Sequence, residues 1–251
     1  MRIGLIGAGN MARALAIGLG EPVVCSDPLR ERAQALADEV GGRAVSANAD
    51  VVDACELVVL CHKPGQLEDV AAPLDVGETI VLSLLSGVAL ADLRAAYPGV
   101  RCYRMMPNTA VEIRAGAIGL AEDDAGDPDA FAEVRELLER LGEVLVVPER
   151  LLAPLTAVAG VAPAYMALVA EAQADAAIRA GVPAEIAQRL VGASMAGGVA
   201  VLRARGMDTL AVRRAVTSPG GVTARGLAAL EAGGVRTAFD SAMDAVLGGG
   251  A

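Results

Sequence analysis

The sequence predicts a parallel α/β domain over residues 1–150, followed by an all-α domain over residues 151–251. Three observations support this fold class. Short apolar runs alternate with amphipathic stretches in the first part. A glycine-rich turn follows the first apolar run. From about Leu151 onward, β-branched runs give way to alanine-rich stretches of helical length.

Eight apolar runs in the first part have the length and composition of buried strands. They are Arg2–Ile6, Pro22–Ser26, Arg43–Val45, Leu57–Cys61, Thr79–Leu84, Arg101–Met105, Ala115–Leu120 and Glu143–Val147. The amphipathic stretches between them include Asn10–Leu19, Leu29–Glu39, Leu90–Tyr97 and Pro128–Leu141. This alternation predicts a mainly parallel sheet with helices on both faces.

The second part consists of helical stretches whose ends are marked by glycine and proline. They are Ala164–Ala180, Ala184–Arg205, Thr209–Ala215, Gly221–Ala232 and Ala238–Leu247. Small side chains let helices approach closely but leave little large apolar area on each helix. We therefore expect a second subunit to complete this core.

Leu151–Ala170 has 20 residues without a charge, which is long enough to cross a bilayer. Because Pro154, Gly160 and Pro163 interrupt it, we expect a buried helix pair in a soluble core and no membrane contact. The start of the sequence lacks the pattern of a signal peptide, since its apolar run is short and followed by glycines.

Composition excludes several classes of function. The net charge of −10 argues against a nucleic-acid partner, which requires a basic face. One histidine, His62, and four cysteines without a C-x-x-C pair predict no metal site. The cysteine pattern favours a reducing, cytoplasmic location. Catalytic chemistry that needs no histidine is therefore favoured.

The sequence G-A-G-N-M-A directly follows the first predicted strand and opens a helix. It matches the dinucleotide-binding fingerprint with Ala12 in the third small position. Gly7 permits the tight turn, and Gly9 lets a pyrophosphate approach the backbone. Asn10 and Met11 open the helix whose N-terminus faces the phosphates. The first domain is thus predicted to be Rossmann-type, with NADH or NADPH as cofactor.

Asp27 lies 20 residues after Gly7, at the end of the second predicted strand beside Ser26. An acid there accepts ribose hydroxyls and disfavours a 2′-phosphate, which indicates NAD. Arg30 and Arg32 follow and could bind a phosphate, so NADP stays open. In the alternative interpretation, Ser26 or Asp27 only caps the next helix.

Two further groups of candidates lie at the carboxyl edge of the predicted sheet. Lys63, the only lysine among 21 cationic residues, stands with Pro64 after the fourth strand, which suggests a place near the cofactor rather than a surface turn. After the sixth strand, Met105 and Pro107 precede Asn108. The Asn108 amide can orient a nicotinamide or a substrate, or can simply form a turn.

The segment T-S-P-G-G-V-T at 217–223 lies in the helical part. We predict Ser218 as an N-cap and Pro219 as the first helical residue. Gly220 and Gly221 would then expose backbone N–H groups suited to a carboxylate, with the Thr223 hydroxyl nearby. The alternative is an ordinary helix start.

These motifs together resemble the pyrroline-5-carboxylate reductase family over nearly the whole chain. The resemblance is carried by I-G-A-G-N-M-A (6–12), H-K-P (62–64), S-L-L-S-G-V (83–88), R-M-M-P-N-T-A (104–110), P-A-Y (163–165) and V-T-S-P-G-G-V-T (216–223). It implies hydride transfer from NADH or NADPH to the C=N carbon of 1-pyrroline-5-carboxylate, giving L-proline, the last step of proline biosynthesis. It also implies a C-terminal domain that interlocks two subunits in a homodimer or a higher oligomer.

The resemblance implies site residues as well. Ser218, Gly220, Gly221 and Thr223 would hold the substrate carboxylate and ring nitrogen, with Thr223 the candidate catalytic residue. This segment would face the nicotinamide of the partner subunit. Asn48 falls where the family has an asparagine near the cofactor.

The sequence departs from the family pattern at 159–162, where A-G-V-A replaces residues that include two serines. Another NAD(P)H-dependent imine reductase and a non-catalytic nucleotide-binding paralogue therefore remain alternatives. A β-hydroxyacid dehydrogenase is disfavoured because its catalytic lysine would lie in the helical domain, which has none.

Overall fold

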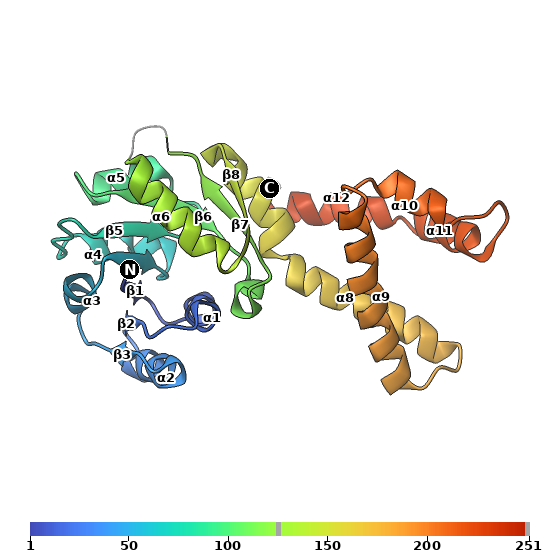
Figure 1. The fold of residues 1–251 in the computed structure, drawn as a ribbon, viewed down its shortest axis with the longest axis horizontal. Helices are drawn as coiled ribbons and strands as arrows, with labels where there is room; N and C mark the ends of the chain where they lie inside the picture. The colour runs from blue at the N-terminus through green and yellow to red at the C-terminus, as the bar shows by residue number, and fades with distance from the viewer. Residues whose placement is uncertain (124–126, 249–251) are drawn as a thin grey trace. The chain divides into compact units, whose positions relative to one another are not determined.

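The computed structural model describes residues 1–123 and 127–248. The chain divides into two compact units, Met1–Pro163 and Ala164–Ala251 (Figure 1). This division falls at Pro163, inside a helical run, whereas the sequence suggests a boundary at residue 151. Each unit is described by itself below.

The first unit contains an eight-stranded sheet in the order β3-β2-β1-β4-β5-β6-β7-β8. The strands are β1 Ile3–Ile6, β2 Val24–Ser26, β3 Arg43–Ala44, β4 Leu57–Leu60, β5 Ile80–Ser83, β6 Cys102–Met106, β7 Gly116–Ala121 and β8 Gly142–Val147. Every neighbouring pair is parallel except β6 and β7. The predicted, mainly parallel sheet is confirmed, and its strand ends lie within two residues of the predicted ones.

Helices cover both faces of the sheet. They are α1 Asn10–Leu19, α2 Arg30–Val40, α3 Asn48–Ala54, α4 Leu67–Ala71, α5 Leu90–Ala96 and α6 Pro128–Glu139, with short 3-10 turns η1 Pro64–Gln66, η2 Thr109–Ile113 and η3 Glu149–Leu151. Apolar residues of α1, α2 and α6 pack into one buried cluster, and those of α3, α4 and α5 pack into another. The sheet is therefore buried on both sides, as its continuous apolar strands require.

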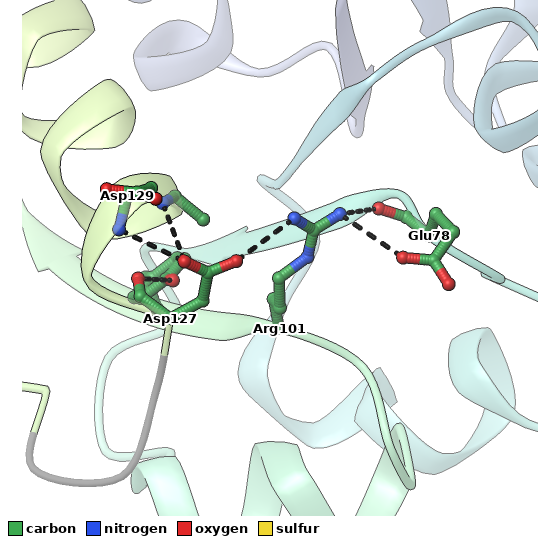
Figure 2. A network of polar contacts seen from close by, with 6 residues as sticks. Glu78, Arg101, Asp127 and Asp129 are labelled. Carbon is green, nitrogen blue, oxygen red and sulfur yellow. Dashed lines mark hydrogen bonds and ion pairs between the residues drawn. The ribbon is translucent and has the colours of Figure 1, made fainter.

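A polar network anchors α6 beside the start of β6 (Figure 2). The Asp127 carboxylate caps α6 by accepting hydrogen bonds from the backbone N–H groups of Asp129 and Ala130, at 3.0 and 3.3 Å. Arg101 lies 3.6 Å from the same carboxylate and also contacts the backbone carbonyl of Glu78. These contacts satisfy helix-end groups at a surface rim away from the carboxyl edge of the parallel strands.

The second unit is helical, with α8 Ala162–Arg179, α9 Ala184–Ala204, α10 Thr209–Ala215, α11 Val222–Ala232 and α12 Val235–Val246. Its only buried cluster among the described residues is formed by Ala174, Ala187 and Val191. Large apolar side chains on these helices, such as Leu168 and Leu190, are exposed. The expectation of an incomplete core within one chain agrees with this packing.

The uncharged segment Leu151–Ala170 does not form the predicted pair of helices. Residues 149–179 form one helical run through α7 Leu152–Leu155 and a π-helical turn η4 Thr156–Gly160 into α8. By length and composition alone this run could cross a membrane, and only 11% of its most apolar window is buried. The predicted buried helix pair is therefore wrong. Pro154 and Pro163 each fall in the first turn of a helix, where proline is tolerated, so neither breaks the run.

Candidate functional site

The carboxyl ends of β1, β2 and β4 border a cavity of about 580 Å³. Six predicted cofactor residues line it: Gly7, Gly9, Ser26, Asp27, Asn48 and Lys63. The structure thus brings together predicted residues from four separate segments at the edge where open parallel sheets bind ligands. A larger hollow of about 850 Å³ includes Met1, Glu56 and Glu78, but it contains none of the predicted site residues.

The two glycines of the fingerprint meet different requirements. Gly7 has a φ of +104°, and its N–H donates to the Ser26 carbonyl at 2.8 Å. A Cβ on Gly7 would lie 2.7 Å from the Cys61 carbonyl carbon. A Cβ on Gly9 would meet nothing within 4 Å. Gly7 is therefore required by the protein backbone, whereas Gly9 is exposed and leaves open space beside the backbone.

The N-terminus of α1 is suited to an anion. Its first helical hydrogen bond runs from Arg13 N to Gly9 O at 2.9 Å, and no side chain of a described residue caps the helix. The N–H groups of Asn10 and Met11 therefore have no acceptor within the helix. Free amides at a helix N-terminus beside an open glycine fit the pyrophosphate of a dinucleotide.

Asp27 lies in this cavity with both carboxylate oxygens held by the backbone. Oδ2 accepts from Ala8 N at 2.9 Å, and Oδ1 accepts from Leu29 N at 2.8 Å. The helix-capping alternative is not observed, because α2 has Leu29 at its N-cap and no side-chain cap. Beside it, the Ser26 hydroxyl donates to Asn48 Oδ1 at 2.7 Å, which leaves the Asn48 amide N–H groups as donors.

Lys63 and His62 reach the cavity from the end of β4. Lys63 is exposed, and its backbone N–H donates to Gln66 Oε1 at 3.2 Å. His62 Nδ1 lies 2.9 Å from the Lys63 carbonyl oxygen, and burial lowers the pKa of His62. A neutral imidazole follows at pH 7. Pro64 instead borders a neighbouring hollow of about 640 Å³.

The predicted residues in and directly after β6 do not line the cavity. Met105 and Pro107 are buried, and Met105 packs in the apolar core. Asn108 is also buried; its Nδ2 donates to the Ala159 carbonyl at 3.0 Å, and its Oδ1 accepts from Ala117 N at 3.3 Å. The Asn108 amide thus already has backbone partners on both ends. Contact between these three residues and a cofactor stays a prediction.

The predicted N-cap and first residue of α11 are wrong by three residues. Gly221 is the N-cap and Val222 the first helical residue, so Ser218 and Pro219 precede the helix. Gly221 N donates to Ser218 O at 3.0 Å, and Gly220 has a φ of +69°. These are features of a type II turn, with proline and glycine at its centre. A positive φ cannot continue an α-helix, which is why the glycine pair stays outside it.

The turn still leaves a helix N-terminus without a side-chain cap among the described residues. Thr223 is the second residue of α11 and is half-buried. A Cβ on Gly221 would lie 2.4 Å from Ser218 Oγ, so only glycine fits beside that hydroxyl in its present position. The turn and the first helical amides therefore form a compact set of donors.

Sequence reasoning missed some residues that line the cavity, including Ser46 and Gln66. Both lie close to features that the sequence predicts. Ser46 comes just after β3, and Gln66 lies three residues after Lys63. Their position at the carboxyl edge was the available signal. Arg32 also lines the cavity, consistent with its consideration as a phosphate ligand.

A doubly wound sheet with this cavity, joined to an alanine-rich helical unit, defines the class of NAD(P)-dependent oxidoreductases. Residues 2–87 match the family model for NADP oxidoreductase, coenzyme F420-dependent, and residues 149–248 match that for pyrroline-5-carboxylate reductase dimerisation. The chain belongs to the pyrroline-5-carboxylate reductase family. The apolar helical run lies within the region that matches the dimerisation model.

Known relatives match over almost the full length. The pyrroline-5-carboxylate reductase of Synechocystis is 33% identical, over 98% of this chain and 95% of the relative. That of Mycobacterium tuberculosis is 35% identical, over 97% and 94%. The structure of the Streptococcus pyogenes enzyme superposes with a TM-score of 0.88 at 29% identity, covering 98% of this chain and 96% of that one.

Proposed function

We propose that this chain reduces 1-pyrroline-5-carboxylate to L-proline with NADH or NADPH, the last step of proline biosynthesis. The observation that carries the proposal is the full-length match to reductases of this name, which includes both the cavity region and the helical unit. The geometry supports it independently, because an open glycine turn and an uncapped helix N-terminus are suited to a dinucleotide.

The first unit would hold the cofactor. Gly7 shapes the turn, Gly9 leaves room at the backbone, and Asn10 and Met11 offer amides to the pyrophosphate. Further contacts would come from the other predicted residues, namely Ser26, Asp27, Asn48, Lys63, Pro64, Met105, Pro107 and Asn108. The NADH or NADPH held there supplies the hydride that reduces the C=N carbon.

The second unit would hold the substrate. The turn at Ser218, Gly220 and Gly221 and the first amides of α11 offer donors for the substrate carboxylate. Thr223 would place its hydroxyl at the ring nitrogen, as a hydrogen-bond partner or a relay for the proton that accompanies hydride addition. Because burial lowers the pKa of His62, that residue is a poor proton source at neutral pH.

We also propose that two chains associate through the C-terminal helices, as a homodimer or a higher oligomer in the cytoplasm. The dimerisation family model over residues 149–248 and the exposed apolar side chains of α8 and α9 support this assembly. A complete active site would then combine the cofactor domain of one chain with the substrate turn of its partner.

The test is a steady-state assay of the purified full chain that follows cofactor oxidation at 340 nm. We expect oxidation of at least one reduced cofactor that depends on 1-pyrroline-5-carboxylate. We expect Thr223→Ala to lower kcat/KM about 100-fold, because a positioned hydroxyl at the reacting nitrogen is lost. Thr223→Ser should restore most of the activity, and Thr209→Ala, at the start of α10, should change little.

Two results would contradict these claims separately. If neither cofactor is oxidised, the reductase activity is wrong. If Thr223→Ala turns over like the wild type while the wild type is active, only the role of that hydroxyl is wrong.

A further inference from the structure

The imidazole of His62 has one nitrogen held by the backbone and one that is left as an acceptor. Nδ1 lies 2.9 Å from the Lys63 carbonyl oxygen, which can only accept, so Nδ1 carries the proton. Burial lowers the pKa of His62, and the ring is therefore neutral at pH 7. In a neutral imidazole with its proton on Nδ1, Nε2 offers a lone pair and no hydrogen.

The Nε2 atom of His62 is buried and has no hydrogen-bond partner within residues 1–123 and 127–248. In those ranges, three other residues have a buried side-chain atom without a partner: Tyr97, Arg104 and Thr217. None of these three lines the cavity at the carboxyl edge of the sheet, whereas His62 does. Because a buried acceptor without a partner destabilises a protein, a ligand that donates a hydrogen to Nε2 would remove that penalty.

The place of His62 in the sheet identifies the ligand as the dinucleotide. His62 follows β4, which pairs with β1, so it lies at the same edge as the glycine turn and the amides of α1. A Cβ on Gly7 would lie 2.9 Å from His62 N, so the two segments approach closely. A pyrophosphate at those amides has acceptors alone, whereas the ribose hydroxyls and the adenine amino group are donors. Nε2 therefore complements the parts of the dinucleotide that adjoin the pyrophosphate.

We propose that His62 is a cofactor-binding residue whose Nε2 accepts a hydrogen bond from a ribose hydroxyl or the adenine amino group of the dinucleotide. Because Nε2 has almost no surface open to solvent, a small shift of the side chains around it accompanies binding. This inference rests on the dinucleotide site proposed above. It adds a neutral acceptor to a site whose other proposed contacts are mainly backbone amides and charged groups.

The first experiment observes Nε2 directly by ¹⁵N NMR of the full-length protein without a histidine tag. Because the sequence has a single histidine, both imidazole nitrogen signals belong to His62. The signal of an unprotonated nitrogen moves part of the way toward that of a protonated one when it accepts a hydrogen bond. We expect this partial movement for Nε2 at pH 7 when ADP-ribose is added, since that probe contains the adenine, the pyrophosphate and both riboses.

The second experiment measures the binding of ADP-ribose to variants by calorimetry. We expect His62→Leu to bind about 5- to 10-fold more weakly, because one hydrogen bond to the ligand is lost, and to keep a melting temperature near that of the wild type. His62→Gln still offers an oxygen acceptor and should recover most of the affinity. Tyr97→Phe is the matched control: it removes another buried atom without a partner, outside this cavity, and should bind like the wild type.

A second probe, ADP, locates the donor because it lacks the second ribose. If His62→Leu weakens the binding of ADP as much as that of ADP-ribose, the donor belongs to the adenosine half. If the binding of ADP is unchanged while that of ADP-ribose is weakened, the donor is a hydroxyl of the second ribose. Either result supports the proposed contact.

Three outcomes would overturn the proposal while the dinucleotide site itself still stands. ADP-ribose binds the wild type but the Nε2 signal does not move; or Nε2 becomes fully protonated in the complex and so donates to the ligand; or His62→Leu binds ADP-ribose as tightly as the wild type does. The first two outcomes are read from the wild type and stay decisive if His62→Leu does not fold. If ADP-ribose does not bind the wild type, the dinucleotide site fails, and the contact fails with it.

Discussion

At the scale of single residues, the two glycines of the fingerprint have different roles. Gly7 is needed for the fold, whereas Gly9 is needed for access of a ligand to the backbone. Gly7 has a φ of +104°, and a Cβ added to it would lie 2.7 Å from the Cys61 carbonyl carbon. Gly9 has an extended conformation, and a Cβ added to it would meet no atom within 4 Å. An alanine at Gly7 would carry both a conformational cost of about 1–2 kcal/mol and a clash with the Cys61 carbonyl. An alanine at Gly9 would carry neither.

We expect Gly9→Ala to keep the wild-type melting temperature within about 1 °C and to weaken NADH binding at least 10-fold, because its methyl group fills the approach to the α1 amides. We expect Gly7→Ala to lower the melting temperature by several degrees, since about 1 kcal/mol moves the midpoint of a domain this size by 2–4 °C. Calorimetric melting and NADH titration check both variants. A stable Gly7→Ala protein, or a Gly9→Ala protein with full affinity, would refute the distinction.

The buried thiol of Cys25 makes the free energy of unfolding depend on pH in the alkaline range. This thiol is fully buried in β2 and donates to the Ala33 carbonyl at 3.3 Å. Burial, and to a lesser degree the Asp27 charge, raises its pKa to about 11 from an ordinary value of 9.0. The folded thiol therefore keeps its proton at pH values where the unfolded thiol has lost it.

The sign of the pH dependence follows directly. The stabilising contribution is complete below pH 9 and is lost as the pH rises from 9 to 11, at about 1.4 kcal/mol per pH unit for one thiol. We expect the free energy of unfolding, measured with urea, to decline over this range. Cys25→Ala should make this decline shallower by about 1.4 kcal/mol per pH unit. Val24→Ala, in the same strand, should leave the slope unchanged. An unchanged slope in Cys25→Ala would show that this thiol does not carry the effect.

At the scale of secondary-structure elements, two buried polar side chains hold the beginning of the long helical run. They are Arg104 in β6 and Asn108 just after β6. Arg104 donates to Glu149 Oε1 at 2.7 Å, and the same oxygen accepts from Leu90 N at the start of α5. Asn108 contacts the Ala159 carbonyl in the π-helical turn. Both ends of residues 149–159 are thereby tied to the sheet before the chain enters α8.

We expect Asn108→Ala to lower the free energy of unfolding of the first unit by about 2 kcal/mol, because it leaves the Ala159 carbonyl and the Ala117 N–H without their partner. Urea unfolding followed by circular dichroism measures this change. Thr109→Ala, at the exposed neighbouring residue, should fall within about 0.5 kcal/mol of the wild type. Equal effects of the two substitutions would contradict the bridging role of Asn108.

The strands were predictable because buried parallel strands have continuous apolar sequences that differ from the surrounding amphipathic helices. The short helices α3 and α4 were not identified. Length alone does not explain this for α3, because α5 has the same 7 residues and was identified; the large apolar residues of α3 are two adjacent valines, which show no helical period. The start of α11 was misplaced for another reason. Proline favours both the first helical position and the second position of a turn, and only the positive φ of Gly220 decides between them.

The candidate site was predictable where it depended on strand ends, because Gly7, Asp27 and Lys63 each follow a strand of the parallel sheet. The hydrogen bond from the Ala8 amide to Asp27 was not predictable, because it depends on a side-chain direction that no local sequence pattern specifies. The same holds for Asn108, whose partner Ala159 lies 51 residues away.

At the scale of the whole molecule, the two units differ in how well one chain buries its apolar residues. The first unit has two extensive buried clusters, while the second has a small one and many exposed large apolar side chains. Leu168 on α8 is 64% exposed and Leu190 on α9 is 58% exposed. Exposed apolar surface on this scale indicates a partner surface.

We expect Leu168→Glu and Leu190→Glu to shift the protein toward monomers at micromolar concentration, and to lower its melting temperature, because each places a charge in the apolar contact. Analytical ultracentrifugation measures the association. Ile113→Glu is the control, since Ile113 is 77% exposed but belongs to the first unit, and it should keep the wild-type mass. Unchanged mass in both helical variants would place the contact elsewhere.

The position of Lys63 in the cavity has a practical consequence for chemical labelling. The sequence has no other lysine, so an amine-reactive ester can acylate only this ε-amine and the α-amine. Because Lys63 lines the cavity, a ligand bound there would shield it from the reagent, while the α-amine would provide an internal reference. The mass of the acylated protein would then report how much of the nucleotide site is occupied, without any enzymatic turnover.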